Sequence, residues 1–143
     1  MGQRILITGA RRGIGAAIAV GLSRPGTTLL LHRLGAAEEA YGVARLCDDL
    51  GAGAELVEAD LADADAVRKL ASRAGPVDVL INNAARVQHR PRGAAIGRLA
   101  ADVRGERDRP DGDLVATVRL LVSDGSGALT GQVLEVGGGL IFR

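Results

Sequence analysis

The stretch Thr8-Gly9-Ala10-Arg11-Arg12-Gly13-Ile14-Gly15 decides the fold of this chain, because it places three glycines between a predicted strand and a predicted helix. An apolar run at 5–7 precedes it, and a run of alanine, isoleucine and valine at 16–20 follows. In that context a glycine-rich turn is typical of a loop that binds nucleotide phosphates. The alternative is a tight strand-to-helix connection that binds no ligand.

Each glycine of this loop has a distinct expected role. Gly9 permits the tight turn, Gly13 lets the backbone approach a pyrophosphate, and Gly15 lets the helix pack closely on the strand. The first turn of the helix adds free N–H groups and the positive end of the helix dipole. The residues of this loop expected to bind the nucleotide are Gly9, Arg11, Arg12, Gly13, Ile14 and Gly15.

Strand and helix patterns alternate as far as residue 83, which predicts an α/β fold with a parallel sheet. We expect strands at 4–8, 27–32, 55–59 and 77–81, and helices at 14–23, 36–50 and 63–74, with Asp63 as an N-cap. Right-handed crossovers then give the strand order 3-2-1-4, with a ligand crevice between strands one and four.

The rest of the chain has a different pattern. Residues 86–110 form an arginine-rich connection, and 111–139 are expected to hold a last helix and a strand at 132–136. Leu114, Val118, Leu121 and Val122 lie on one face of that helix. We predict a single domain over 1–143, whose nucleotide-binding half is 4–85. The last strand would extend the sheet beside strand four, or an exchange of chains in a dimer would do so.

Composition excludes several classes of protein. The formal net charge is +1, and no aromatic residues are interleaved with the arginines, so a nucleic-acid partner is not expected. No segment is long and apolar enough for a membrane span, and the spacing of acidic residues, histidines and cysteine suggests no metal site. The single cysteine, Cys47, suits a reducing compartment, so the expected location is cytoplasmic.

Three motifs together resemble the short-chain dehydrogenase/reductase family, in particular members similar to 3-oxoacyl-ACP reductases. They are the glycine stretch 8–15, Asp60-Leu61 after strand three, and Asn82-Asn83-Ala84-Ala85 after strand four. Segments at 96–99, 123–124, 130–132 and 136–139 are similar to the end of that family's sequence. The resemblance implies a Rossmann-like, three-layered, doubly wound sheet in a shortened form.

The resemblance also assigns roles to residues outside the glycine loop. It implies that Asp60 and Leu61 meet the adenine, and that the backbone of Asn83, Ala84 and Ala85 lines the adenosine ribose. Ala85 stands where the family has glycine. The bound molecule is then a nicotinamide dinucleotide.

The end of strand two indicates which dinucleotide is bound. Proteins that bind NAD usually have an acidic residue there, which bonds the ribose 2′-hydroxyl, whereas this chain has His32-Arg33. Arg33, with Arg11 or Arg12, is expected to clasp a 2′-phosphate, which favours NADP(H) over NAD(H). The alternative is that Arg33 is a solvated charge at the end of the strand.

The family's catalytic segments do not occur between the motifs that end at residue 85 and the similar segments that begin at residue 96. The family uses a Ser and a Tyr-x-x-x-Lys motif, whereas the only tyrosine here, Tyr41, is followed by Arg45 on a helix between strands two and three. Tyr41 is expected to be partly buried there. His32 is expected to contact ribose or solvent, and His89 to lie in a surface loop.

These observations leave three functions open. The first is binding of NADP(H) without efficient turnover, so whether the chain is an enzyme stays open. The second is an active oxidoreductase, acting on a carbonyl or alcohol, whose proton donor is non-standard or comes from a partner. The third is an inactive remnant. A homodimer through the last helix and strand is also possible, and the sequence does not identify a substrate.

Overall fold

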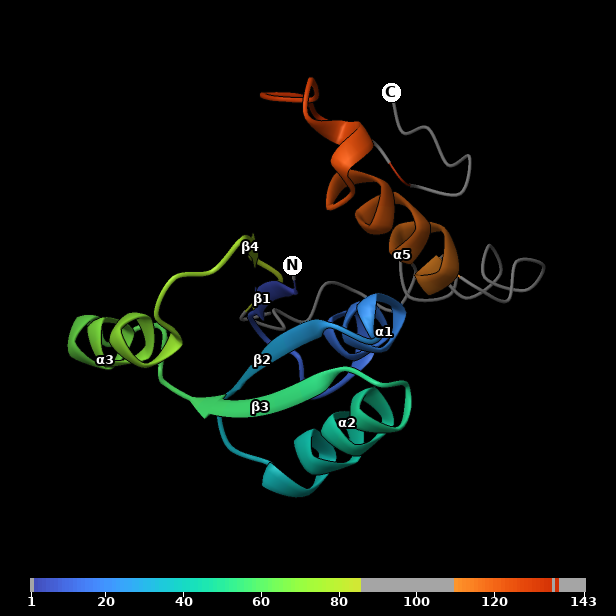
Figure 1. Cartoon of the computed structure of the whole chain (residues 1–143). Coiled ribbons are helices and arrows are strands. Elements are labelled where there is room, and N and C mark those ends of the chain that lie inside the picture. Colours follow the sequence, from blue (N-terminus) through green and yellow to red (C-terminus); the bar gives the residue numbers. More distant parts are fainter. Residues whose placement is uncertain (1, 86–109, 135, 137–143) are drawn as a thin grey trace, which may run out of the picture. The chain divides into compact units, whose positions relative to one another are not determined.

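The computed structural model describes residues 2–85, 110–134 and 136, in two compact units whose boundary follows residue 85. The first unit alternates strand and helix throughout (Figure 1): β1 (Gln3–Ile7), α1 (Gly13–Leu22), β2 (Thr27–Arg33), α2 (Ala37–Asp49), β3 (Gly53–Glu58), α3 (Ala64–Ala74) and β4 (Val79–Ile81). Every element predicted for 4–85 is therefore present, with its ends displaced by a few residues.

The four strands form one parallel sheet in the order β3-β2-β1-β4. In register, Ile5 of β1 lies between Leu29 of β2 and Val79 of β4. This confirms the predicted order 3-2-1-4. Because all four strands run the same way, the loops that follow them meet at one edge of the sheet.

Alternate residues of the strands face the two layers of helices. Ile5, Ile7, Leu29 and Leu31 are fully buried, and α1 and α2 lie together on one side of the sheet while α3 lies on the other (Figure 1). Leu6, Leu30 and Val57 point the other way and pack against Leu70 and Ala74 of α3. Each fully buried leucine or isoleucine stabilises the fold by roughly 1.5–3 kcal/mol.

The helices supply their own matching faces. In α2 the buried residues are Ala40, Val43, Ala44 and Cys47, spaced at three- and four-residue steps as a helix face requires. Cys47 is completely buried, and that burial raises the pKa of its thiol. Asp63 caps α3 as predicted, since its side chain accepts a hydrogen bond of 2.8 Å from the Asp65 N–H.

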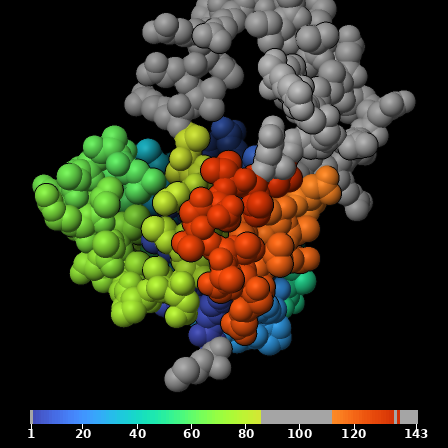
Figure 2. Space-filling view, turned by 90° about the horizontal axis from the view of Figure 1, so that it is seen from above, coloured from blue at the N-terminus to red at the C-terminus, as the bar shows by residue number. Residues whose placement is uncertain are grey.

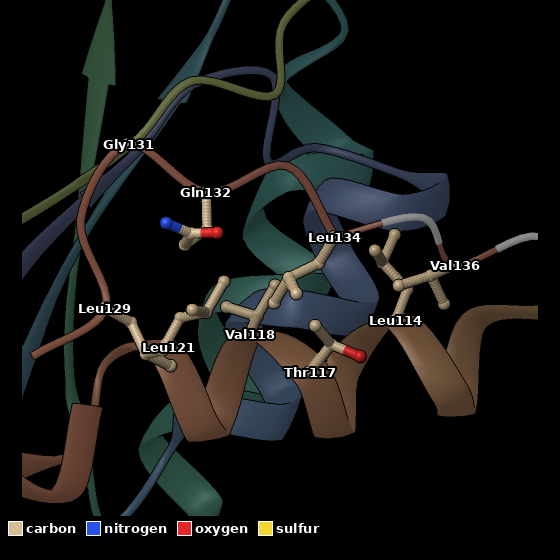
Figure 3. A pocket seen from close by; sticks show the side chains of 9 residues that line it. All are labelled: Leu114, Thr117, Val118, Leu121, Leu129, Gly131, Gln132, Leu134 and Val136. Atoms are coloured by element: carbon tan, nitrogen blue, oxygen red, sulfur yellow. The ribbon is translucent and has the colours of Figure 1, made fainter.

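The second unit contains α5 (Pro110–Leu121) and a short 3₁₀ helix, η1 (Asp124–Ser126). Its described part forms one contiguous body, coloured orange to red in Figure 2. The predicted apolar face of the helix is confirmed in part, because Leu114, Val118 and Leu121 line a hollow of about 230 Å³. Leu129, Gln132, Leu134 and Val136 close the hollow from the other side (Figure 3).

The strand predicted at 132–136 is wrong for the residues that the structure describes. Neither 132–134 nor 136 is in a strand, and the sheet formed by the described residues ends at β4. A strand needs the backbone of a neighbour to pair with, and β propensity alone does not supply one. Leu134 and Val136 instead face the hollow beside α5, while Val133 is 94% exposed.

Three further predictions lie outside the described residues. The arginine-rich connection falls almost wholly on 86–109, which includes His89 and the segment at 96–99. In the described ranges, no helix is long and apolar enough to cross a membrane.

Candidate functional site

The glycine loop connects β1 to α1 in the conformation that its glycines allow. Gly9 has φ +69° and Gly13 has φ +56°, both in the left-handed region that side chains disfavour. A Cβ added to Gly13 would meet nothing within 4 Å, so the space beside this residue is open. Ile14, the next residue, is 45% exposed.

Gly15, by contrast, lies at a point of close contact. A Cβ there would overlap the carbonyl oxygen of Gly9 and come within 2.5 Å of the Asn83 side-chain nitrogen. A Cβ on Gly9 would in turn lie 2.9 Å from the Cα of Ala84. The two glycines therefore let α1 and the segment after β4 approach the same turn.

Thr8 and Asn83 fasten that turn to the end of β4. The hydroxyl of Thr8 accepts hydrogen bonds from the N–H groups of Asn83 and Ala84, at 2.9 and 3.0 Å, and donates to the carbonyl of Ile81. The Asn83 amide donates to the carbonyls of Thr8 and Gly9, at 2.9 and 3.2 Å. The side chain of Asn83 thus positions the loop, and its backbone N–H, like that of Ala84, is already bonded to Thr8.

His32 fastens the other side of the loop, and here the sequence prediction is wrong. The residue is buried, with 3% exposed, so it contacts neither ribose nor solvent. Its Nδ1 accepts from the Gly9 N–H at 3.2 Å, and its Nε2 lies 3.0 Å from the Ala59 carbonyl oxygen. Because an N–H group can only donate, Nδ1 is the acceptor, and the imidazole carries its proton on Nε2 and donates it to the Ala59 carbonyl.

Arg33 occupies the predicted place at the end of β2, but its charge is already paired. Its NH2 lies 2.8 Å from Oε2 of Glu58, the residue opposite it on β3, and its NH1 donates to the Gly35 carbonyl at 3.2 Å. Its Nε is buried and has no hydrogen-bond partner among the described residues. The contact of Arg33 with a 2′-phosphate stays a prediction, and a 2′-phosphate would have to compete with Glu58 for this guanidinium.

Of the two arginines of the glycine loop, one is paired with a carboxylate and the other is not. Arg11 forms an ion pair of 3.1 Å with Glu39 of α2. Arg12 immediately precedes α1 and is exposed, and its guanidinium has no ion pair or hydrogen bond with any part of the chain that is described. Arg12 is thus the unpaired cation closest in sequence to the start of α1.

The remaining predicted contacts lie at the same edge of the sheet. Asp60 and Leu61 follow β3 and are exposed, and Asp60 accepts a hydrogen bond from the Ala62 N–H at 2.9 Å. Ala84 and Ala85 follow β4 and are also accessible. All twelve residues expected to bind the cofactor therefore follow, or end, the carboxyl ends of the strands.

This edge suits a diphosphate and offers little for proton transfer. The first turn of α1 leaves N–H groups without helical partners, and the open space beside Gly13 and the unpaired Arg12 fit an anion. Tyr41 lies on α2 and is 58% exposed, so the expectation that it is partly buried is wrong. Among the described residues, no group of three or more His, Cys, Asp or Glu could hold a metal ion.

Sequence reasoning assigned no contact to Thr8, Glu39 or Glu58, and it gave His32 the wrong contacts. Thr8 and His32 are buried polar residues at strand ends, and Glu39 and Glu58 pair with Arg11 and Arg33. Glu58 is recognisable only once the register of β2 and β3 is known, because that register places it opposite Arg33. His32 gave no such signal, since a histidine before an arginine at a strand end usually indicates a polar surface.

Comparison with known proteins identifies the first unit. A family model for short chain dehydrogenase matches residues 3–98. The 3-oxoacyl-[acyl-carrier-protein] reductase FabG of Staphylococcus aureus is 36% identical over 88 residues, which cover 59% of this chain and 36% of that protein. D-erythrulose reductase of Gallus gallus is 42% identical over 85 residues, covering 59% of this chain and 32% of that protein. The chain spans about a third of the length of these curated relatives.

Solved structures show the same likeness. A metagenomic short-chain oxidoreductase in complex with NADP is 36% identical, with a TM-score of 0.52, over 59% of this chain and 39% of that one. The landomycin C-6 ketoreductase LanV with bound NADP and rabelomycin is 35% identical, with a TM-score of 0.51, over 60% of this chain and 39% of that one. The family match ends at residue 98, so the resemblance at 123–139 lies outside it.

The close contact at Gly15 gives a stability prediction. We expect Gly15→Ala to lower the free energy of unfolding by about 1–3 kcal/mol, because the methyl group must displace backbone and the Asn83 amide. Gly42→Ala is the matched control, since this glycine of α2 has open space around it and should gain roughly 0.5–1 kcal/mol. Urea denaturation measures both, and equal stability of the two variants would contradict the packing described for Gly15.

The hydrogen bonds of His32 give a second stability prediction. His32→Ala removes the partners of Gly9 and Ala59 and leaves a cavity, so we expect a loss of about 2–4 kcal/mol. His32→Asn keeps an acceptor near the position of Nδ1 and should lose clearly less. Urea denaturation again provides the measurement. A loss below 0.5 kcal/mol for His32→Ala would show that the imidazole does not hold the loop.

Proposed function

The chain belongs to the short chain dehydrogenase family, and from this premise we propose that it binds NADP(H) at the loop 9–15 without efficient turnover. The observation that carries the proposal is the fastened glycine loop. His32 of β2 and Asn83 after β4 hold it from both sides, Asn83 through Thr8 at the start of the loop, while the space beside Gly13 stays open. A rigid loop with exposed N–H groups binds a diphosphate without first having to be ordered.

The adenosine end of the ligand has matching residues in this proposal. Asp60 and Leu61 would meet the adenine, and the backbone at 83–85 would line the ribose. Arg33 would bind a 2′-phosphate through charge-assisted hydrogen bonds, with Arg11 or Arg12 as the second cation. The two solved relatives named above contain NADP, which supports this choice of dinucleotide over NAD.

The proposal of inefficient turnover rests on the chain's supply of proton donors. A bound nicotinamide dinucleotide supplies or accepts a hydride, and a general acid or base must then lie within hydrogen-bond reach of the reacting oxygen. Tyr41, the only tyrosine, is on α2, and Lys69, the only lysine, is on α3. Arg45 cannot replace a lysine whose pKa is adjusted, because a guanidinium stays charged.

A second candidate function follows from the relatives' names. Both curated relatives are reductases. The chain would then be an active NADP(H)-dependent oxidoreductase whose proton donor is non-standard or comes from a partner. This candidate predicts turnover that the first does not.

Calorimetric titration with NADP⁺ and NAD⁺ tests the binding site. We expect Arg33→Ala to weaken NADP⁺ binding by about 10- to 100-fold, the loss of one or two charge-assisted hydrogen bonds, and to change NAD⁺ binding less than two-fold. Arg45→Ala, at an exposed arginine of α2, is the control and should change neither affinity. Equal effects of Arg33→Ala on both nucleotides would contradict the assigned 2′-phosphate contact.

NADPH oxidation with a panel of ketones and aldehydes separates the two candidates. The first expects no rate above that of nucleotide alone. A robust rate that survives Tyr41→Phe would favour the second and require another acid. If the chain binds neither NADP(H) nor NAD(H), both candidate functions are rejected and the inactive remnant is left.

A further inference from the structure

The ion pair between Arg33 and Glu58 lies at the point where cofactor choice would be made. The two residues end neighbouring strands and are opposite each other in the β2–β3 register. Their charged atoms are 2.8 Å apart, and the Arg33 side chain is only 15% exposed whereas that of Glu58 is 53% exposed. The carboxylate therefore neutralises a mostly buried guanidinium from the solvent side.

Glu58 satisfies this guanidinium incompletely. A guanidinium binds an oxyanion best through two parallel N–H groups, such as Nε and one terminal nitrogen. Here NH2 meets Glu58, NH1 meets the Gly35 carbonyl, and Nε is buried without a partner among the described residues. A phosphate has more acceptor oxygens than the single one that Glu58 contributes, so it can satisfy both Nε and NH2 if Arg33 turns toward it.

We propose that Glu58 is a positioning residue that sets cofactor specificity, because it holds Arg33 in an ion pair that a 2′-phosphate must break. This inference rests on the proposed binding of a dinucleotide at this edge. Glu58 opposes 2′-phosphorylated dinucleotides in two ways, by competing for Arg33 and by repelling the phosphate charge. Glu58 has neither effect on a dinucleotide with a free 2′-hydroxyl. It therefore lowers the ratio of the affinity for NADP(H) to the affinity for NAD(H).

The chain offers a closely matched control on the same strand. Glu55 pairs with Arg4 at 3.4 Å, and its side chain is 49% exposed. It lies three residues before Glu58, in the middle of β3 and opposite Leu30 of β2. Glu55→Gln removes the same charge from a similar environment without touching Arg33.

The test compares dissociation constants of NADP⁺ and NAD⁺ by calorimetry. We expect Glu58→Gln to bind NADP⁺ about 3- to 10-fold more tightly than the wild type, as the loss of a partly exposed competing pair and of like-charge repulsion predicts. NAD⁺ affinity should change less than two-fold, and Glu55→Gln should leave both affinities unchanged. In an Arg33→Ala background, Glu58→Gln should lose most of its effect, which makes the pair a double-mutant cycle.

Each other outcome overturns the inference in a recognisable way. If Glu58→Gln leaves the ratio of the two affinities unchanged, or weakens NADP⁺, the inference fails while the proposed function stands. If the same gain persists in Arg33→Ala, Glu58 acts by repulsion alone and not through Arg33. If the wild type binds neither nucleotide, the proposed function and the inference fail together. Thermal unfolding of each variant is the control that checks whether the substitution has kept the fold.

Discussion

The hydroxyl of Thr8 makes the contact on which the candidate site depends. It accepts hydrogen bonds from the N–H groups of Asn83 and Ala84, and these bonds join the end of β1 to the segment after β4. Thr8 is buried, and a buried hydroxyl left without its hydrogen-bond partners costs about 1–3 kcal/mol, so these bonds are expensive to break. On the other side of the loop, His32 adds the same kind of restraint through Gly9 and Ala59. The glycine loop is therefore held from both sides, and this lets the positive-φ glycines Gly9 and Gly13 form a fixed turn with an open surface beside Gly13.

Much of the first unit could be predicted from sequence alone. Strand and helix patterns alternate with distinct periods, and the right-handed crossover rule leaves few ways to order four parallel strands. The glycines at 9, 13 and 15 indicated both a turn and a close packing contact, and the structure has both. These features follow from local chemistry, which a single sequence records.

What sequence could not supply are the partners of polar groups. His32 is polar and ends a strand, yet it is buried because Gly9 and Ala59 satisfy both of its nitrogens. The prediction for Arg33 had the right position but lacked Glu58, which becomes its neighbour only once β2 and β3 pair. The strand predicted at 132–136 failed for a related reason. Its propensity is local, but strand formation depends on a partner backbone, and Leu134 and Val136 pack near α5 instead.

The central claim is that the loop 9–15 binds the diphosphate of a dinucleotide, and amide chemical shifts test it most directly. In a ¹⁵N-labelled sample of the full chain titrated with NADP⁺, the largest shifts should fall on Gly13, Ile14 and Gly15, with further shifts at Arg33 and Ala84. Residues 112–121 of α5 should stay largely unchanged. Saturable shifts confined to α5, with the amides of 9–15 unmoved, would contradict the account.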